Sequence, residues 1–494
     1  MADEIELKLL VSPDAGKQLE SCFVENLATK YSHESCLLYN SYYDTPDRAL
    51  NRMEMACRVR GKDGVFEQTI KTRGSVVGGL HQRPEYNVAI EGNTPNLKLF
   101  TDVPWPDGVL VDELQDQLTC LFDTQFQREI YLLDYAGSEV ELVFDSGAIE
   151  TAKHQESICE IELELKHGNP KVLVELSQKL LDRFNFRLGS QSKAQRGYRL
   201  VDGIALERLR LRESLPQISS GSLEDALLAC LQKVLEHWQH CEQVFIEEKK
   251  LRELRSIART IRFLQFFLTQ FGKQLDCEEL LEVADKLKVL ESSWKWTSEL
   301  DALRELRSKK GAFRKKLASN ERLRRELKAS VGNLLEKHRP ENLIQDKSYV
   351  SVQLDILSLL VERPWRVKSK GYLERIETCA VEWVKNVAHE IKQVLNDAGQ
   401  ISKTQYLAQT DLLRRMWYMD LFLSDELMSV VATDELNWKN ILDGIRELHT
   451  LRVLENHLSK SQLEEKDVLM QWCHTKQQHM LELMDEEKYN FTQL

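Results

Sequence analysis

Acidic and basic side chains alternate with apolar ones near the start of the chain, in Glu4-Ile-Glu-Leu-Lys8. If this run is a β-strand, successive side chains point to opposite faces, and Glu4, Glu6 and Lys8 share one face. Carboxylate oxygens are the ligands that hard divalent cations prefer, and an ammonium group binds phosphate. A strand at a solvated surface shows the same alternation, so this run alone leaves both interpretations open.

The same arrangement recurs downstream, in short alternating runs that carry charges on one face. Arg58 and Arg60 share a face, and the following run, which is expected to pair with theirs, ends at Lys71. In residues 158–166 three glutamates alternate with apolar residues. If these runs belong to one closed sheet, the charged faces meet inside it. The expected interior holds the basic residues Arg58, Arg60, Lys71, Arg83, Arg128 and Lys193 and the acidic residues Glu4, Glu6, Asp145, Glu160, Glu162 and Glu164.

Roughly eight antiparallel strands of this length can close into a barrel. Burying so many charges without a ligand would cost many kcal/mol, whereas a water-filled tunnel lined by charges avoids that cost. The basic side of such a tunnel suits a polyanion, and the acidic side suits divalent cations. A phosphate chain bound together with Mg²⁺ or Mn²⁺ satisfies both sides.

The overall composition narrows the class of protein. The chain has 494 residues, of which 42% are hydrophobic and 30% charged, which is typical of a globular protein with two or more domains. The formal net charge of -12 argues against nucleic-acid binding through a general basic field. No membrane span and no signal peptide are expected, and the ten scattered cysteines are typical of reduced thiols. We therefore expect a cytoplasmic protein without a nucleic-acid or membrane partner.

The pattern of the chain changes after about residue 200. Short alternating runs with turn signals give way to long stretches rich in Leu, Glu, Lys, Arg and Gln with apolar residues at helical spacing. The fold class is therefore α+β, with an antiparallel β-barrel followed by an all-α bundle. We place the barrel in residues 1–202, a linker in 203–221 and the helical domain in 222–494. Helices from Ser12 to about Lys30 and over residues 170–184 would cover part of the barrel, and helix breaks are expected near Gly272 and Gly332.

The ExExK run from Glu4 to Lys8 resembles the signature of the CYTH superfamily, the triphosphate tunnel metalloenzymes. The similarity extends in order over the first ~200 residues. It is carried by Arg58-x-Arg60, Lys71, the run from Gly78 to Tyr86, Arg128, Asp145, the ExExE run from Glu160 and Ser192-Lys193. The family includes inorganic triphosphatases, thiamine triphosphatases, class IV adenylate cyclases and RNA triphosphatases. The resemblance implies an eight-stranded antiparallel barrel that holds a triphosphate inside.

The resemblance also implies roles for the charged residues. Metal ligands would be Glu4, Glu6, Asp145, Glu160, Glu162 and Glu164. Phosphate would be bound by Lys8, Arg58, Arg60, Lys71, Arg83, Arg128 and Lys193, of which the first four are the candidates for catalytic residues. In the family, one divalent ion neutralises the phosphates and a second activates water, so two ions, Mg²⁺ or Mn²⁺, are expected.

The leading hypothesis is a metal-dependent inorganic triphosphatase, which hydrolyses triphosphate to diphosphate and phosphate by metal-activated water inside the tunnel. Thiamine triphosphatase or nucleoside triphosphatase activity is the alternative within the hydrolases. A class IV type of adenylate cyclase is another alternative, because the same tunnel could bind ATP. A non-enzymatic polyphosphate-binding protein is the remaining one.

In the helical part, Arg252, Arg255, Arg259 and Arg262 recur at helical spacing. A solvated helix face is the favoured interpretation of this stripe, and anion binding is the alternative. The order of the parts and the stripe resemble a CHAD domain, a helical domain tied to polyphosphate, although Arg252 stands at the histidine position of its motif. The resemblance implies polyphosphate as a possible partner of the helical domain.

Overall fold

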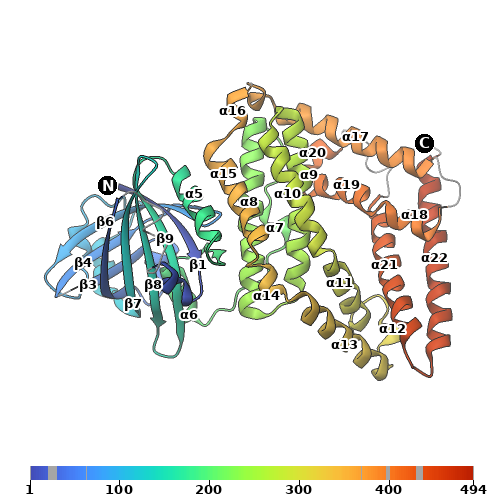
Figure 1. Cartoon of the computed structure of the whole chain (residues 1–494), viewed down its shortest axis with the longest axis horizontal. Coiled ribbons are helices and arrows are strands. Elements are labelled where there is room, and N and C mark those ends of the chain that lie inside the picture. Colours follow the sequence, from blue (N-terminus) through green and yellow to red (C-terminus); the bar gives the residue numbers. More distant parts are fainter. Residues whose placement is uncertain are drawn as a thin grey trace. The chain divides into compact units, whose positions relative to one another are not determined.

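The computed structural model describes residues 2–19, 30–62, 64–368, 370–396, 401–429 and 438–492. The contacts within the chain divide it into two compact units. The first contains residues 1–207 and 344–362, and the second contains residues 208–343 and 363–494. Figure 1 shows strands in the first of these units and helices in the second.

An antiparallel barrel forms the first unit. Its eight strands in the described residues are β1 (Ala2–Leu10), β2 (Lys30–Asp44), β3 (Ala56–Lys62), β4 (Val65–Lys71), β6 (Leu80–Ile90), β7 (Thr119–Tyr135), β8 (Ser138–Glu150) and β9 (Gln155–His167). The strand order is β1-β9-β8-β7-β2-β3-β4-β6, and pairing of β6 with β1 closes the barrel. The short strands β5 (Ser75–Val77) and β10 (Arg187–Leu188) pair with β6 and β1. The predicted eight-stranded barrel is confirmed.

Alternation along the strands separates the two faces of the barrel wall. In β1, Leu7 and Leu9 are completely buried on the outer face, whereas Glu4, Glu6 and Lys8 point to the inside. Helix α5 (Lys171–Leu181) packs on β1 and β9 and buries its own apolar side chains there. Helix α6 (Lys193–Asp202) contacts β7 and β8. Helix α5 therefore covers part of the apolar outer face, whereas α6 lies on the inner side, where Lys193 and Tyr198 line the cavity.

Two boundaries differ from the sequence prediction. Helix α1 covers only Asp14–Gln18, and the rest of the helix expected up to about residue 30 lies outside the described residues, except that Lys30 begins β2. Strand β2 starts at Lys30, where the sequence predicts helix, and pairs with β7 along its whole length. The reason is that residues 30–35 are exposed and polar, so no apolar alternation marks them as a strand.

The remaining elements of the first unit are short, apart from helix α15. They are α3 (Ala49–Arg52), η2 (Leu97–Leu99) and α4 (Val111–Gln117). Helix α15 (Lys347–Glu362) comes from the second half of the sequence but is grouped with the barrel, because it packs on α5. The boundaries proposed from the sequence do not include this segment in the barrel unit.

The second unit consists of helices. Its long helices are α8 (Leu223–Glu248), α9 (Arg252–Leu275), α10 (Glu278–Trp294), α11 (Trp296–Arg307), α13 (Glu321–His338), α17 (Ile376–Asn396), α19 (Thr410–Phe422), α21 (Trp438–Lys460) and α22 (Lys466–Thr492). Shorter helical segments are α7 (Leu211–Ser214), α12 (Arg314–Leu317), α14 (Pro340–Leu343), α16 (Trp365–Lys368), η3 (Gly371–Leu373), α18 (Lys403–Ala408) and α20 (Asp425–Met428).

Helix α9 ends at Leu275, shortly after Gly272, so the break expected near Gly272 is confirmed, whereas the break expected near Gly332 is wrong because α13 continues through that residue. A Cβ at Gly272 would lie 2.7 Å from Leu281 of the next helix, so this glycine serves close packing and not chain reversal. Asp276, in the left-handed conformation, ends α9 instead.

No helix in the described residues is long and apolar enough to cross a membrane. The described cysteines are free thiols, most of them buried. The cytoplasmic location expected from the sequence stays a prediction.

Candidate active site in the barrel

A cavity of about 400 Å³ lies inside the barrel. Its wall comes from all eight strands, with α6 contributing Lys193. Most of the residues that the sequence placed in the interior line this cavity, namely Glu4, Glu6, Lys8, Arg58, Arg60, Lys71, Arg83, Arg128, Glu162, Glu164 and Lys193. Asp145 and Glu160 do not line the cavity. Both are fully buried in a network of charges beneath the lining side chains.

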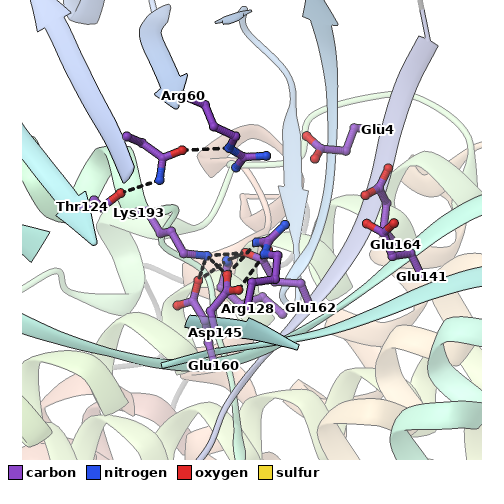
Figure 2. Close-up of polar contacts among 12 residues, drawn as sticks. Glu4, Arg60, Thr124, Arg128, Glu141, Asp145, Glu160, Glu162, Glu164 and Lys193 are labelled. Carbon is purple, nitrogen blue, oxygen red and sulfur yellow. Dashed lines mark hydrogen bonds and ion pairs between the residues drawn. The ribbon is translucent and has the colours of Figure 1, made fainter. Parts of the chain in front are cut away.

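The buried network joins the carboxylates of β8 and β9 to four cations. Arg128 donates two hydrogen bonds to Asp145, at 2.7 and 2.6 Å, and one of its nitrogens lies 3.0 Å from Glu162. Lys193 contacts all three carboxylates, at 2.7 Å for Asp145 and 3.1 Å for Glu162. Figure 2 shows these side chains pointing toward one another. The remaining cations are Lys8, which contacts Glu160 and Glu162, and Arg196, which lies 3.0 Å from Glu160.

The protonation states follow from this pairing. Burial by itself would raise the pKa of Glu160, but Lys193 and Lys8 outweigh it and lower the pKa to about 2. The pKa of Glu162 lies well below its usual value for the same reason. Burial disfavours the charged form of Lys8, yet Glu160 and Glu162 raise its pKa well above the ordinary value. Glu160, Glu162 and Lys8 are therefore ionised at neutral pH.

A second group of charges lies at the β1–β4–β6 side of the cavity. Lys71 pairs with Glu4 and lies 3.1 Å from Glu85, whose other oxygen is 3.5 Å from Arg58. Burial raises the pKa of Glu4 to about 7, although Lys71 acts in the opposite direction. Glu4 is thus a carboxyl group that a nearby divalent cation would convert fully to the carboxylate.

Glu141 is a lining residue that the sequence analysis missed. It precedes Asp145 by four positions on β8, so the two side chains share a face. Glu141 is paired in register with Glu164 of β9, and Lys166 lies 3.4 Å from the first and 2.8 Å from the second. Glu141 and Glu164 lie next to each other in Figure 2, apart from the Asp145 network. Because every second residue of a strand lies on the same face, counting back from Asp145 along the strand would have identified Glu141 as a lining residue.

His81 has a structural position. It is 2% exposed, and its Nε2 lies 3.1 Å from the carbonyl oxygen of Gly189. Burial is the main reason that its pKa falls to about 4. The ring of His81 is not among the residues that line the cavity.

The donor set fits a hard divalent cation. Asp145, Glu160 and Glu162 each offer an oxygen, and these atoms lie within 4.8 Å of one another. In this structure the same oxygens are held by Lys8, Lys193, Arg128 and Arg196, so a cation would take the place of an ammonium or guanidinium group. Oxygen donors without sulfur or imidazole suit Mg²⁺ or Mn²⁺ better than softer metals.

The arginine stripe of α9 is less exposed than the sequence predicted. Arg255 and Arg262 are 7% and 9% exposed, so the solvated-face interpretation is wrong for these two residues. Arg255 donates to Ser298 at 2.7 Å, and Arg262 donates to Glu291 at 2.9 Å. The physical reason is that α10 and α11 pack against this face of α9.

The comparisons with known proteins concern the barrel unit. Residues 2–198 match the model of the CYTH domain. An inorganic triphosphatase from Haemophilus influenzae is 38% identical over 203 residues, which make up 40% of this chain and 55% of that protein. The chain thus spans about half the length of this curated relative.

Among solved structures, a Hippeastrum protein described as an adenylyl cyclase with a dominant triphosphatase activity is 21% identical. The match covers 40% of this chain and 96% of that chain, with a TM-score of 0.30. A Pyrococcus horikoshii protein is 18% identical over 38% of this chain and 94% of that chain, with a TM-score of 0.26.

Three observations on the first unit agree: the closed barrel, the charges that line its cavity and the family match over the same residues. Over residues 2–198 this chain is therefore similar to the CYTH domain family.

Proposed function

We propose that the barrel is a metal-dependent inorganic triphosphatase, which hydrolyses triphosphate to diphosphate and phosphate. The observation that carries the proposal is the meeting of cations and carboxylates in one enclosed cavity. A volume of about 400 Å³ lies near the lower end of small-molecule sites, which span ~300–1,000 Å³. The relative from Haemophilus influenzae is an inorganic triphosphatase, which supports the choice of substrate.

The proposed binding step is an exchange of partners. Without an anion, the cations of the tunnel pair with its carboxylates. A triphosphate would take over the phosphate-binding set, and two divalent cations, Mg²⁺ or Mn²⁺, would take over the carboxylates. The proposed phosphate-binding residues are Lys8, Arg58, Arg60, Lys71, Arg83, Arg128 and Lys193, and the proposed metal ligands are Glu4, Glu6, Asp145, Glu160, Glu162 and Glu164.

The chemistry follows from the charges of the lining. The bound metal would neutralise phosphate charge and lower the pKa of a water molecule for attack on a terminal phosphorus. Lys8, Arg58, Arg60 and Lys71 would hold the phosphoryl oxygens and stabilise the charge that develops on them. Lys8 and Lys71 keep their positive charge at neutral pH, because the neighbouring glutamates outweigh burial and raise the pKa of both ammonium groups.

The lining favours an inorganic chain over a nucleotide. A nucleobase gains much of its binding energy from stacking on an aromatic ring. The aromatic residues of the lining, Tyr42, Phe126 and Tyr198, are only 6%, 2% and 5% exposed, because they belong to the core cluster under the wall. In the described residues the cavity thus offers charges but no open aromatic face.

The test is a substrate panel with the full chain. Phosphate release is measured with inorganic triphosphate, thiamine triphosphate and ATP, each with Mg²⁺, with Mn²⁺ and with a chelator. We expect the highest kcat/KM for inorganic triphosphate and no turnover with the chelator. A preference for ATP or thiamine triphosphate would overturn the substrate, cyclic AMP as the main product would overturn hydrolysis, and binding without turnover would leave a polyphosphate-binding protein.

We further propose that the helical unit binds polyphosphate, as a CHAD-like domain would. The observation that favours this is the charged surroundings of Arg255, which is buried on α9. The charges of Arg259, Arg262 and Arg414 act on Arg255, although Arg262 also pairs with Glu291 and Arg414 with Asp411. Burial, and then the neighbouring arginines, lower the pKa of Arg255 well below its usual value. An anion would relieve this repulsion.

Calorimetric titration of the full chain with a long inorganic polyphosphate tests the second proposal. Arg259→Gln, at one of the arginines that act on Arg255 and 30% exposed at its side chain, should weaken binding about tenfold. Arg314→Gln, an exposed residue of α12, is the control and should bind as the parent does. Equal affinity of the Arg259 variant and the parent would contradict this site.

A further inference from the structure

Arg60 differs from most cations of the tunnel. Within the described residues it has no carboxylate within ion-pair distance, a lack that it shares with Arg83. Seven other cations of the lining each contact at least one carboxylate oxygen, namely Lys8, Arg58, Lys71, Arg73, Arg128, Lys166 and Lys193. Arg60 thus carries a positive charge that its own protein does not neutralise.

A neutral side chain holds Arg60 in place. The Nε of Arg60 donates a hydrogen bond of 2.8 Å to Oδ1 of Asn40, and Nδ2 of Asn40 donates one of 3.0 Å to Oγ1 of Thr124. Figure 2 shows the two bonds as dashed lines between Arg60 and Thr124. Asn40 is 2% exposed and Thr124 is 1% exposed, so water competes little with these bonds.

The register of the sheet imposes this contact. Asn40 of β2 lies directly opposite Arg60 of β3 on one side and opposite Thr124 of β7 on the other. Residues in register keep their side chains about 5 Å apart and on the same face. The three side chains therefore form a row across three strands, and the backbone ladder fixes their spacing.

The orientation of the Asn40 amide follows from donor and acceptor chemistry. A guanidinium group only donates, so the amide oxygen must face Arg60 and the amide nitrogen must face Thr124. The Thr124 hydroxyl then accepts that N–H. An amide turned the other way would place two donors against each other, so Arg60 selects the orientation of the amide. The Thr124 hydroxyl can accept or donate, and here it accepts and anchors the far side of the amide.

We propose that Asn40, anchored by Thr124, is a positioning residue that holds Arg60 as an unneutralised receptor for a phosphate group in the tunnel. This inference rests on the proposed function, because it assigns a task to one cation of that site. An amide suits the task because it orients the guanidinium group without cancelling its charge. An aspartate at the same position would hold Arg60 equally well but would take the place of the anion.

The substitution Asn40→Asp keeps the acceptor that positions Arg60 but adds a negative charge beside the guanidinium group. We expect the dissociation constant of inorganic triphosphate, measured calorimetrically with a chelator present, to rise roughly 10- to 100-fold, which is the range of one charge-assisted hydrogen bond. The melting temperature of the variant without ligand should equal or exceed that of the parent, because Arg60 gains an ion pair. A merely structural role of Asn40 predicts a lower melting temperature and unchanged affinity, and that result would overturn the inference.

Two further variants complete the test. Thr124→Val keeps the shape but removes the acceptor of the Asn40 amide, and it should raise KM several-fold with little change in kcat. Asn87→Asp adds the same charge to another neutral lining residue, one that contacts Thr69 and not Arg60. If Asn87→Asp weakens binding as much as Asn40→Asp, the effect is a general one of charge and the positioning role is wrong.

Failure of the inference can be distinguished from failure of the proposed function. If the parent binds triphosphate but hydrolyses it with no metal, the proposed activity is wrong, while weaker binding by Asn40→Asp still supports the receptor. If the parent hydrolyses triphosphate and Asn40→Asp has the parent's KM and affinity, the proposed activity stands and the inference is overturned. If the parent does not bind triphosphate at all, both are overturned.

Discussion

The charged residues of the tunnel have two tasks at the scale of single side chains. In the structure they neutralise one another, and in the proposed reaction they would bind phosphate and metal. Lys8 illustrates the conflict, because it is 1% exposed and held by Glu160 and Glu162 although it also lines the cavity. Arg58 makes fewer and longer contacts with carboxylates than Lys8 does. It lies 3.5 Å from Glu85 and donates a hydrogen bond of 3.1 Å to Thr69. Removing the two side chains should therefore affect the fold to different extents.

Lys8→Met should destabilise the barrel by about 3 kcal/mol, since a buried carboxylate loses one of its cations. Arg58→Met should cost about 1 kcal/mol, because Lys71 remains beside Glu85. For a unit of this size the melting temperatures would fall by roughly 6–12 °C and 2–4 °C. Thermal melting of the full chain, followed by a probe of β structure, measures both. Equal shifts would contradict the structural task of Lys8.

Glu162→Gln should weaken the response to metal. The amide can still accept a hydrogen bond but lacks the charge that a divalent cation requires. We expect the metal concentration for half-maximal turnover to rise at least about tenfold, with saturating metal restoring part of kcat. The matched control is Glu156→Gln, since Glu156 lies outside the cavity lining and pairs with Arg196 and Arg199. An unchanged metal titration of Glu162→Gln would remove this residue from the proposed ligands.

At the scale of elements, helix α6 brings Lys193 to the cavity and also closes the core on that side. Ser192 begins the helix with a capping box that includes Gln195, so Lys193 occupies the first helical position next to the tunnel. The helix packs closely on β7, since a Cβ at Gly197 would lie 2.1 Å from the ring of Phe122. Phe122 is 2% exposed and stacks on Tyr42, so the ring has little room to move.

Gly197→Ala should destabilise the chain, although alanine is the better helix former by about 1 kcal/mol. The added methyl group would push α6 away from β7 and move Lys193, so KM for triphosphate should rise as the melting temperature falls. Gly332→Ala, in α13, is the matched control, because a Cβ there meets no atom within 4 Å. That variant should be neutral or more stable by up to about 1 kcal/mol. A similar outcome for both glycines would refute close packing of α6.

At the scale of the whole molecule, the two compact units do not correspond to two continuous stretches of the sequence. Helix α15, residues 347–362, lies far along the chain, yet it packs on α5 and groups with the barrel. Lys171 of α5 lies 2.7 Å from Glu362 at the end of this helix. Exposed pairs of this kind contribute little, so apolar burial must account for most of the association.

A fragment of residues 1–207 should therefore be less stable than the same residues in the full chain. It would expose the face of α5 that α15 covers, bind a hydrophobic dye and melt several degrees lower. The control fragment carries residues 344–362 attached through a flexible linker and should recover part of the stability. If the short fragment melts with the barrel transition of the full chain and binds no dye, α15 is not part of the barrel unit.

The sequence by itself determined which residues face the inside of the barrel. The alternation of side chains along a strand is a local property. The face on which Glu4, Arg58 and Glu162 lie could therefore be assigned without knowing which strands are adjacent. Residues without charge gave no such signal. Asn40 stands in an aromatic run, and only its register with Arg60 and Thr124 gives it a task.

Only the tertiary structure decided which charges meet. Pairing of β1 with β9 brings Lys8 to Glu160 and Glu162, more than 150 positions away. Among the described residues, the register of β3 brings no carboxylate within ion-pair distance of Arg60. The tertiary structure also buries Asp145 and Glu160 beneath the side chains that line the cavity, although both lie on the same strand faces as lining residues. Such distances depend on strand order and register, which result from packing of the whole chain and not from any local run of residues.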